Sequence, residues 1–198
     1  MNSDLDSKKS MRNKLHTKRK CFNKDMYQEA NDVIYNNLIG LISEFPRLDE
    51  VEFSTIHIEG IGLYWPIQGE PDLLKLAFSS TNIISLPKIL KSEMIFVEYN
   101  HLNPVEKSAL SSVFEPKSTI EIIPKLIIIP GLCFSTNGYR IGFGHGYYDK
   151  YLNKIKEIYK PITIGVCFHE NLFEHIEQES HDYQIDYIIT DKIVLRSN

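Results

Sequence analysis

Residues 126–149 read LIIIPGLCFSTNGYRIGFGHGYYD and carry the clearest fold signal in the chain. Leu126–Ile129 is continuously apolar and rich in β-branched residues, which is typical of a strand buried on both faces. Pro130 and Gly131 end this strand. From Tyr147 onward the apolar residues follow helical spacing. A buried strand, a loop and a helix in this order indicate an α/β domain.

The loop between this strand and this helix contains Gly138, Gly142, Gly144 and Gly146, together with Arg140. Glycine adopts positive φ angles and has no Cβ, so successive backbone N–H groups can converge on an anion. The helix N-terminus adds unpaired N–H groups and a partial positive charge, and an arginine adds a bidentate donor. The pattern therefore predicts a phosphate site. Because it matches neither of the two common glycine-rich phosphate motifs, a turn without a ligand is the alternative interpretation.

Five further segments have the apolar character of strands: Ile61–Trp65, Ile83–Leu86, Ile95–Tyr99, Ile162–Val166 and Tyr187–Ile189. Helices are expected over Lys8–Lys20, after the N-cap Asn23, after Pro71 and after Gly146. The second helix carries an apolar stripe formed by Met26, Ala30, Val33, Ile34, Leu38 and Leu41. Alternating strands and helices predict a three-layer α/β fold, with a mostly parallel sheet flanked by helices. Ligands in such folds bind beyond the carboxyl ends of the strands.

Length and composition are those of a globular protein, with 198 residues of which 42% are hydrophobic. We expect a single domain covering residues 1–198, in which residues 1–7 are disordered. No apolar stretch reaches about 18 residues, and the polar, basic N-terminus lacks a secretory signal, so we expect a cytoplasmic protein. The three cysteines lack metal-binding spacing and are expected to be reduced thiols, and the seven histidines show no zinc motif.

The basic residues are concentrated near the N-terminus. Residues 8–24 hold eight of the 22 Lys and Arg residues and no Asp or Glu. Such an arm could bind nucleic acid or a membrane surface, but basic and aromatic residues do not alternate elsewhere, so we expect neither partner. Lys8 and Arg12 are four residues apart and share one helix face, from which they could reach one polyphosphate or simply face solvent.

The loop and its flanks resemble the signature of the 5-formyltetrahydrofolate cyclo-ligase family, whose members are also called methenyltetrahydrofolate synthetases. The residues that carry the resemblance are Pro130, Gly131, Phe134, Gly138, Arg140, Gly142, Gly144, Gly146, Tyr147, Tyr148 and Asp149. The resemblance covers nearly the whole chain, because it extends to the basic N-terminal helix, a YxPxxGE-like segment at residues 64–70 and a C-terminal segment that carries Asp182.

The resemblance implies an enzyme that uses ATP and Mg²⁺ to close 5-formyltetrahydrofolate, with or without a polyglutamate tail, to 5,10-methenyltetrahydrofolate. The formyl oxygen is implied to attack the γ-phosphorus of ATP. N10 then attacks the carbon of the resulting imidate phosphate, and phosphate leaves. No protein nucleophile is needed for this chemistry, so the protein is expected to position the reactants and neutralise charge.

The resemblance also implies roles for individual residues. Arg140 and Tyr147 are implied to act in catalysis. ATP is implied to contact Lys8, Arg12, Arg140, Gly142, Phe143, Gly144, His145, Gly146, Tyr147 and Tyr148. The folate is implied to contact Tyr64, Trp65, Glu70, Phe114 and Tyr147. Mg²⁺ is implied to bind Asp149 and Asp182, with Asp186 as the competing choice for the second ligand.

Residue chemistry alone leaves other interpretations open. Glu70 and Asp149 would each favour a nearby helix N-terminus, and Trp65 could be an ordinary core residue. His145 stands where family members often carry Lys or Gly, which makes the charge at this position pH-dependent. Two other functions remain open: a folate- or nucleotide-binding regulatory protein without turnover, and a phosphosugar isomerase on a similar scaffold. The protein is expected to be a monomer.

Overall fold

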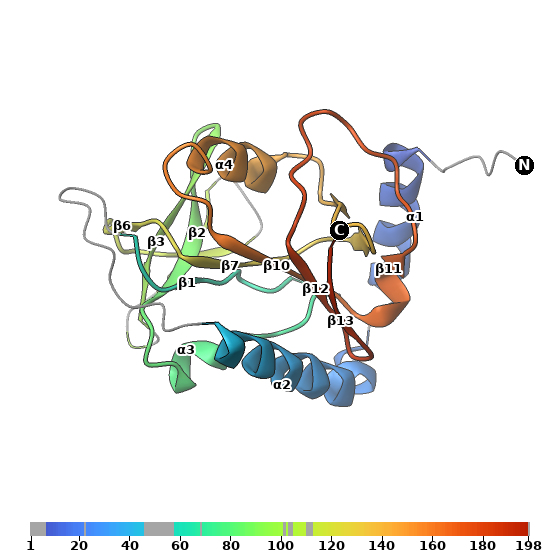
Figure 1. The fold of residues 1–198 in the computed structure, drawn as a ribbon, viewed down its shortest axis with the longest axis horizontal. Coiled ribbons are helices and arrows are strands. Elements are labelled where there is room, and N and C mark those ends of the chain that lie inside the picture. The colour runs from blue at the N-terminus through green and yellow to red at the C-terminus, as the bar shows by residue number, and fades with distance from the viewer. Residues whose placement is uncertain are drawn as a thin grey trace, which may run out of the picture.

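The computed structural model describes residues 7–21, 23–45, 58–67, 69–100, 102, 105–109 and 113–197. Within these residues, eight strands form one large sheet with helices on both faces (Figure 1). In order across the sheet they are β13 (Val194–Arg196), β12 (Tyr187–Ile189), β10 (Ile162–Val166), β7 (Leu126–Ile129), β1 (Ile61–Gly62), β2 (Ile84–Leu90), β3 (Glu93–Tyr99) and β6 (Glu121–Ile122). All four pairs from β12 to β2 are parallel, whereas the pairs at the two edges are antiparallel. The predicted α/β fold with a mostly parallel central sheet is confirmed.

Two smaller sheets lie beside the large one. They are β4 (Val105–Lys107) with β5 (Phe114–Pro116), and β8 (Cys133–Ser135) between β9 (Arg140–Ile141) and β11 (Leu172–Phe173). The α-helices of the described residues are α1 (Lys8–Lys20), α2 (Gln28–Glu44), α3 (Leu76–Ser79) and α4 (Tyr147–Ile155). Two 3₁₀ helices, η1 (Lys24–Tyr27) and η2 (His169–Asn171), complete the description.

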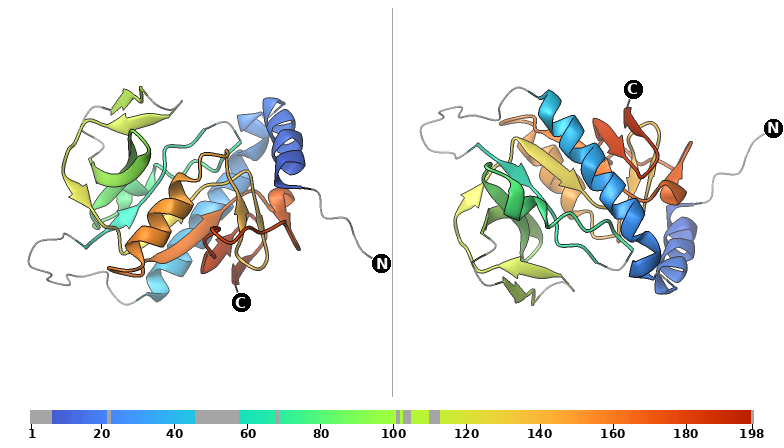
Figure 2. Two further views of the ribbon diagram at one scale, coloured as in Figure 1. Left: turned by 90° about the horizontal axis from the view of Figure 1, so that it is seen from above. Right: turned by 90° about the horizontal axis from the view of Figure 1, so that it is seen from below.

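The side chains of β7 show why helices cover both faces of the sheet. Leu126 and Ile128 pack in one hydrophobic cluster with Leu38 of α2. Ile127 and Ile129 belong to a second cluster, which includes the buried residues of α4. Because neighbouring side chains on a strand point to opposite faces, a strand that is apolar throughout requires a cover on each face. Figure 2 shows α4 and α2 lying across opposite faces, so the three layers are confirmed.

The predicted bounds are confirmed for α1, β7, β10 and β12. The prediction for the first strand is too long, because β1 ends at Gly62; the N–H of Leu63 still donates to the carbonyl of Ser85 in β2, and residues 64–65 lie beyond the strand. The predictions for the next two strands are too short, because β2 and β3 pair with each other as one antiparallel ribbon from Ile84 to Tyr99. The short strands β4, β5, β6, β8, β9, β11 and β13 were not predicted from the sequence.

The start of α2 also differs from the prediction. Asn23 caps η1, where its side chain accepts a hydrogen bond from the N–H of Asp25, so α2 begins only at Gln28. Most of the predicted apolar stripe is buried or partly buried against the sheet: Ala30, Ile34, Leu38 and Leu41. Val33 is 38% exposed, since it lies about 100° around the helix from Ile34. The side chain of Met26 lies outside the described part.

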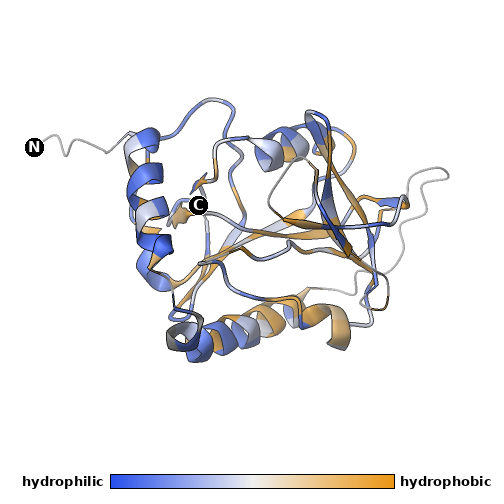
Figure 3. Ribbon diagram, turned by 180° about the vertical axis from the view of Figure 1, so that it is seen from behind, coloured by the Kyte–Doolittle hydropathy of each residue, from blue (hydrophilic) through white to orange (hydrophobic). Residues whose placement is uncertain are grey.

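Helix α1 lies beside the small sheet of β8, β9 and β11 rather than on a face of the large sheet (Figure 1). Its buried residue Leu15 packs in a cluster with Leu132 and Ile141. The rest of the helix is mostly hydrophilic, as Figure 3 shows. The side chain of Ser7 caps the helix by accepting a hydrogen bond from the N–H of Ser10. The prediction of disorder for residues 1–7 is therefore wrong for Ser7, and residues 1–6 lie outside the described part.

Among the described residues, no helix is both long and apolar enough to cross a membrane. The three cysteines are unbonded thiols, as the sequence predicts: Cys21 is exposed, and Cys133 and Cys167 are buried. Burial raises the pKa of Cys133 to about 12, so this thiol stays protonated at neutral pH.

Candidate active site

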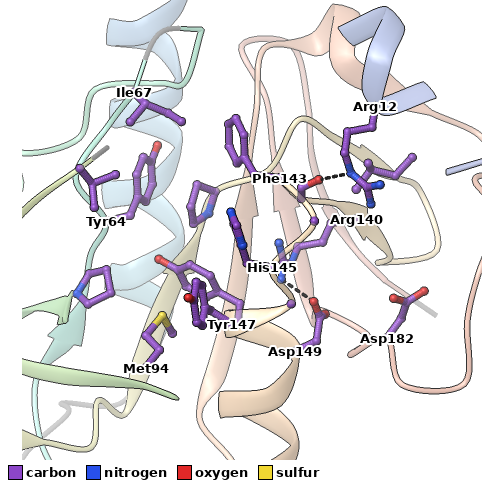
Figure 4. Close-up of a pocket in the computed structure, with 18 of the residues that line it drawn as sticks. Arg12, Tyr64, Ile67, Met94, Arg140, Phe143, His145, Tyr147, Asp149 and Asp182 are labelled. Atoms are coloured by element: carbon purple, nitrogen blue, oxygen red, sulfur yellow. Dashed lines mark hydrogen bonds and ion pairs between the residues drawn. The ribbon is translucent and has the colours of Figure 1, made fainter. Parts of the chain in front are cut away.

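A cavity of about 510 Å³ lies beyond the carboxyl ends of β1 and β7, which is where ligands bind in folds of this type. Figure 4 shows that its two sides differ in character. One side is formed by Tyr64, Ile67 and Met94, and the other by Arg12, Arg140, Asp149 and Asp182. Phe143, His145 and Tyr147 lie between the two sides. The cavity therefore joins a charged end to a largely apolar end.

The glycine loop lines the middle and the charged end of the cavity. Gly144 and Gly146 have φ angles of +105° and +67°, which side chains rarely adopt, and Gly146 is the N-cap of α4. A Cβ on Gly142 would lie 2.7 Å from a guanidinium nitrogen of Arg140, so the guanidinium occupies the space that a side chain would need. The loop thus leads into the N-terminus of a helix of nine residues, as the sequence predicts.

Gly138 has a different role from the other three glycines. It does not line the cavity, and a Cβ on it would lie 2.5 Å from the carbonyl oxygen of Ile185. The N–H of Ile185 in turn donates to the carbonyl of Gly138. Gly138 is therefore required for the close approach of two backbone segments, and the prediction that all four glycines surround an anion is wrong at this position.

Arg140 and Asp149 form an ion pair at the charged end. Nη2 of Arg140 lies 2.7 Å from Oδ2 of Asp149, and the two side chains are only 7% and 15% exposed. The second carboxylate oxygen of Asp149 accepts a hydrogen bond from the N–H of Tyr183, and the guanidinium lies 5.3 Å from the ring centre of Tyr148. The sequence predicts a phosphate-binding arginine and a metal-binding aspartate here, and the structure shows that each neutralises the other.

Lys8 forms a second group of ion pairs at the same end. Its ammonium contacts Asp182 and lies 2.8 Å from a carboxylate oxygen of Glu179. Burial alone would lower the pKa of Lys8, but the hydrogen bonds with these two carboxylates outweigh burial and raise it. Arg12, one turn further along α1, donates from Nε to the carbonyl oxygen of Gly142 at 3.0 Å. Both predicted cations of α1 therefore line the cavity.

Carboxylate oxygens at this end suit Mg²⁺, which prefers oxygen ligands. Asp149 and Asp182 lie on the same side of the cavity (Figure 4). Asp182 is also grouped with Glu179 and His181, whose potential ligand atoms lie within 4.8 Å of one another. The competing candidate Asp186 does not line the cavity, because its carboxylate binds the backbone and side chain of Thr163. The oxygen donors at this end fit the implied metal, and of the two candidates for the second ligand Asp182 lines the cavity whereas Asp186 does not.

At the apolar end, Glu70 is the only acidic residue of the described lining. It is 7% exposed, and one carboxylate oxygen accepts a hydrogen bond from the N–H of Ile67 at 3.0 Å. The other oxygen is buried and has no hydrogen-bond partner among the described residues. Burial raises the pKa of Glu70 to about 7, although the nearby guanidinium of Arg19 lowers it. This carboxylate is available to accept hydrogen bonds from a ligand.

The predicted aromatic residues around Glu70 have different surroundings. Tyr64 is buried and its hydroxyl donates to the carbonyl of Pro71, while its ring lines the cavity. Trp65 also lines the cavity. Phe114 does not, since it packs against Trp65 with ring centres 5.3 Å apart. The structure therefore does not bring Phe114 into the cavity as the resemblance implies.

Several lining residues were missed from the sequence. The apolar wall comes largely from β2, β3 and their surroundings: Ile67, Pro87, Ile89, Met94 and Val113. Pro87, Ile89 and Met94 lie in the parts of β2 and β3 beyond the predicted strand ends at Leu86 and Ile95, and Ile67 and Val113 lie outside the named helices and strands. Arg19 was also missed, although its position in α1, four residues after Leu15, places it on the same helix face as Lys8 and Arg12.

Aromatic rings occupy the junction between the two ends. The rings of His145 and Tyr147 are stacked, with centres 5.5 Å apart. The ring of Phe143 lies 5.3 Å from His16 and 5.4 Å from the guanidinium of Arg19. These rings provide aromatic, partly polar surface between the two ends of the cavity, which suits a heterocyclic ligand.

Known proteins resemble this chain over parts or most of its length. The 5-formyltetrahydrofolate cyclo-ligase of Mycoplasma genitalium is 32% identical over 137 residues, which cover 67% of this chain and 72% of that protein. The enzyme of the same name from Mycoplasma pneumoniae is 29% identical over 140 residues, covering 68% and 74%. The match to the Saccharomyces cerevisiae 5-formyltetrahydrofolate cyclo-ligase is 36% identical and spans 38% of either protein.

Solved structures show the same fold. The 5,10-methenyltetrahydrofolate synthetase of Aquifex aeolicus superposes with a TM-score of 0.75 at 27% identity, covering 96% of this chain and 92% of that one. A synthetase of the same name from Mycoplasma pneumoniae superposes with a TM-score of 0.66 at 24% identity, covering 93% and 98%. The model of the 5-formyltetrahydrofolate cyclo-ligase family matches residues 4–191. This chain belongs to the 5-formyltetrahydrofolate cyclo-ligase family.

Proposed function

We propose that the protein catalyses the ATP- and Mg²⁺-dependent cyclisation of 5-formyltetrahydrofolate to 5,10-methenyltetrahydrofolate, with release of ADP and phosphate. The observation that carries the proposal is the single cavity in which a glycine-lined, charged end meets an apolar end that contains the buried carboxylate of Glu70. Membership of the family and the names of the solved relatives support it.

The chemistry requires the formyl oxygen to become a leaving group. Its attack on the γ-phosphorus forms an oxygen–phosphorus bond and breaks the bond to ADP. N10 then attacks the formyl carbon and loses its proton, and the carbon–oxygen bond breaks as phosphate departs. Negative charge grows on the phosphoryl oxygens during transfer, so fixed cations and N–H groups are the useful protein groups.

The charged end of the cavity supplies such groups. Arg140 is buried and held by its ion pair with Asp149, Arg12 donates a hydrogen bond to the carbonyl of Gly142 in the loop, and Lys8 forms an ion pair with Glu179. The N–H groups of the loop and of the first turn of α4 would bind phosphate oxygens. When bound, Mg²⁺ would be held by Asp149 and Asp182 and would neutralise phosphate charge.

The apolar end fits the folate. The pterin ring carries N–H and amino donors, and the unpartnered oxygen of Glu70 is a matching acceptor. Tyr64 and Trp65 line the same cavity and provide aromatic surface for the ring to pack against. Tyr147 lies between the two ends, so we expect it to contact both reactants, with its hydroxyl near the reacting formyl group.

The test is to supply 5-formyltetrahydrofolate with Mg-ATP and follow the near-ultraviolet absorbance of the methenyl product. Product formation that depends on ATP and Mg²⁺ supports the proposal. Binding of both ligands without product would instead indicate a regulatory protein, and turnover of a phosphosugar without ATP would indicate an isomerase. Arg140→Ala is expected to raise KM for ATP or lower kcat, and Glu70→Ala to weaken folate binding.

A further inference from the structure

Arg19 connects three segments that form the cavity. Its Nη2 donates to the carbonyl of Gly131 at 2.6 Å, immediately after β7. Its Nη1 lies 3.6 Å from Oε1 of Glu70, and its guanidinium lies over the ring of Phe143. The segment at Gly131 leads into the glycine loop, the segment at Glu70 carries the candidate folate carboxylate, and Phe143 is part of the loop itself. One side chain from α1 thus holds the two ends of the cavity together.

The backbone beside Glu70 is shaped to accept Arg19. Gly69 has a φ of +82°, and a Cβ there would lie 2.8 Å from Cγ of Arg19. The side chain of Arg19 is only 10% exposed, and that of Glu70 only 3%. Burying an arginine costs free energy unless it is paired, and the nearest carboxylate is that of Glu70. The space left by Gly69 and the burial of both side chains together indicate that the contact between Arg19 and Glu70 is a specific structural feature, unlike an exposed surface ion pair.

The contact is incomplete without a ligand. Nε and Nη1 of Arg19 and Oε1 of Glu70 are all buried and lack hydrogen-bond partners among the described residues. The distance of 3.6 Å between the two charged groups is an ion-pair distance, but it is too long for a hydrogen bond. A buried carboxylate held beside, but not saturated by, a cation keeps an acceptor free for a donor in the cavity.

We infer that Arg19 is a positioning residue that aligns Glu70 for the folate and favours its ionised form, and that it links this carboxylate to the nucleotide-binding helix α1. The inference rests on the proposed function, since it assigns Arg19 to the folate half of that site. Arg19 touches neither reacting atom and acts through Glu70. Lys8 and Arg12 lie on the same helix as Arg19, so a movement of α1 on nucleotide binding would change the position of Arg19 relative to Glu70.

The charged and titratable groups that face Glu70 come from four elements. They are Arg19 of α1, Arg140 of β9, Tyr64 after β1 and Tyr148 of α4. Burial raises the pKa of Glu70 to about 7, and of the two cations Arg19 opposes this shift more strongly than Arg140 does. Both tyrosines have pKa values raised by burial, so they are neutral near pH 7. Removing the charge of Arg19 is therefore expected to leave Glu70 protonated at neutral pH.

The first experiment needs no folate. Infrared difference spectra of the ligand-free protein would follow the protonated carboxyl band of Glu70, which is assigned by its absence in Glu70→Gln. The titration midpoint is expected near pH 7 in the wild type and at least one unit higher in Arg19→Met, whereas Lys20→Met is the matched exposed control and should not shift it. Equal midpoints in the wild type and Arg19→Met would overturn the inference.

The second experiment measures binding. Trp65 is the single tryptophan and lines the cavity, so its fluorescence reports the Kd of 5-formyltetrahydrofolate from pH 5.5 to 8.5. Wild-type affinity is expected to rise about tenfold per pH unit up to the midpoint and then level off. Arg19→Met should weaken folate binding about fivefold or more at pH 7, because moving the midpoint from about 7 to 8 or above lowers the ionised fraction of Glu70 from about one half to about one tenth or less. When Glu70 is already replaced by Gln, Arg19→Met should cause little further loss of folate affinity. If the two substitutions reduce the affinity additively, Arg19 does not act through Glu70.

A third variant separates charge from folding. Arg19→Lys keeps a cation and is expected to keep the Glu70 midpoint near the wild-type value, even if Arg19→Met folds poorly. A midpoint displaced in Arg19→Lys by as much as in Arg19→Met would overturn the electrostatic role. If Arg19→Met shifts the infrared midpoint as expected but the wild type has no affinity for 5-formyltetrahydrofolate, the proposed substrate is refuted and the Arg19–Glu70 coupling stands.

Discussion

Replacing Lys8 with methionine should convert the acidic group beside it into a site that binds a divalent cation without nucleotide. In the wild type the Lys8 ammonium contacts Asp182 and lies 2.8 Å from Glu179, and the Lys8 side chain is only 11% exposed. These two carboxylates belong to the group with His181 that could hold a metal ion. The ammonium group of Lys8 neutralises the two carboxylates that a metal ion could otherwise bind. Met keeps the length of the side chain and removes its charge.

The size of the effect follows from the charges. Two unit charges about 4 Å apart interact with about 1 kcal/mol even at the dielectric constant of water. A doubly charged ion beside the carboxylates of Asp182 and Glu179 would therefore be repelled by Lys8 by about 2 kcal/mol at low salt. Removing that repulsion should tighten divalent-ion binding about thirtyfold. The true gain should be larger, because the side chain of Asp182 is only 8% exposed.

The assay is calorimetric titration of Mn²⁺ and Mg²⁺ into the nucleotide-free protein at pH 7 and low ionic strength. Lys8 is fully charged there, because its carboxylate partners raise its pKa and its ion pairs are lost only as pH rises through that value. Lys9→Met is the matched control, since Lys9 is the exposed neighbour on the same helix. Thermal unfolding would confirm that each variant is folded. Equal metal affinity in the wild type, Lys8→Met and Lys9→Met would refute the reasoning.

Four further substitutions test individual features. Gly146→Ala should lower the free energy of unfolding by about 1–2 kcal/mol in a denaturant titration, because the φ angle of +67° is strained for alanine even though the nearest atom to the new Cβ, Cε of Lys150, is 3.9 Å away. Gly40→Ala is the control: Gly40 lies within α2 and has no atom within 4 Å of the new Cβ, so this substitution should raise the free energy of unfolding by about 0.5–1 kcal/mol. Tyr148→Phe should leave the free energy of unfolding unchanged or raise it by up to about 1 kcal/mol, because the hydroxyl is buried without a hydrogen-bond partner among the described residues. A decrease in the free energy of unfolding would instead reveal a hydrogen bond to that hydroxyl. Gly165→Ala should destabilise by about 1–3 kcal/mol and lower Tm, because its Cβ would lie 2.4 Å from Cε1 of Phe134, and an unchanged Tm would contradict the packing at β10.

The parts of the fold that the sequence predicts correctly are those whose signal is local. β7 is apolar at every position because both faces are covered, and α1 has a clear polar and apolar pattern. β1 is overestimated because residues 63–65 are as apolar as a strand, but Leu63 is buried in the core next to the strand end, and Tyr64 and Trp65 line the cavity instead of continuing the strand. Strands of two or three residues, such as β9, have too few side chains to show an alternation.

The sequence identifies individual residues of the cavity lining better than the contacts between them. The sequence identifies Arg140 and Asp149 as charged residues around a glycine loop, yet it does not show that they pair with each other in the ligand-free protein. It also does not show that Lys8 contacts Asp182, because 174 positions separate them and only the tertiary fold brings α1 to the C-terminal segment. Arg19 was overlooked because seven other basic residues surround it in sequence, although only the structure shows that it is buried.

These pairings bear on how the proposed reaction can begin. Lys8, Arg140, Asp149 and Asp182 carry two positive and two negative charges, so the four groups are balanced before any ligand enters. Phosphate oxygens favour the two cations, and Mg²⁺ favours the two carboxylates. Mg-ATP can therefore exchange partners with both pairs while every buried charge stays neutralised. Either ligand alone would leave one pair of like charges uncompensated in a partly buried site, which costs several kcal/mol per ion. The geometry accordingly favours entry of the metal and the nucleotide together, and the Lys8→Met experiment separates them.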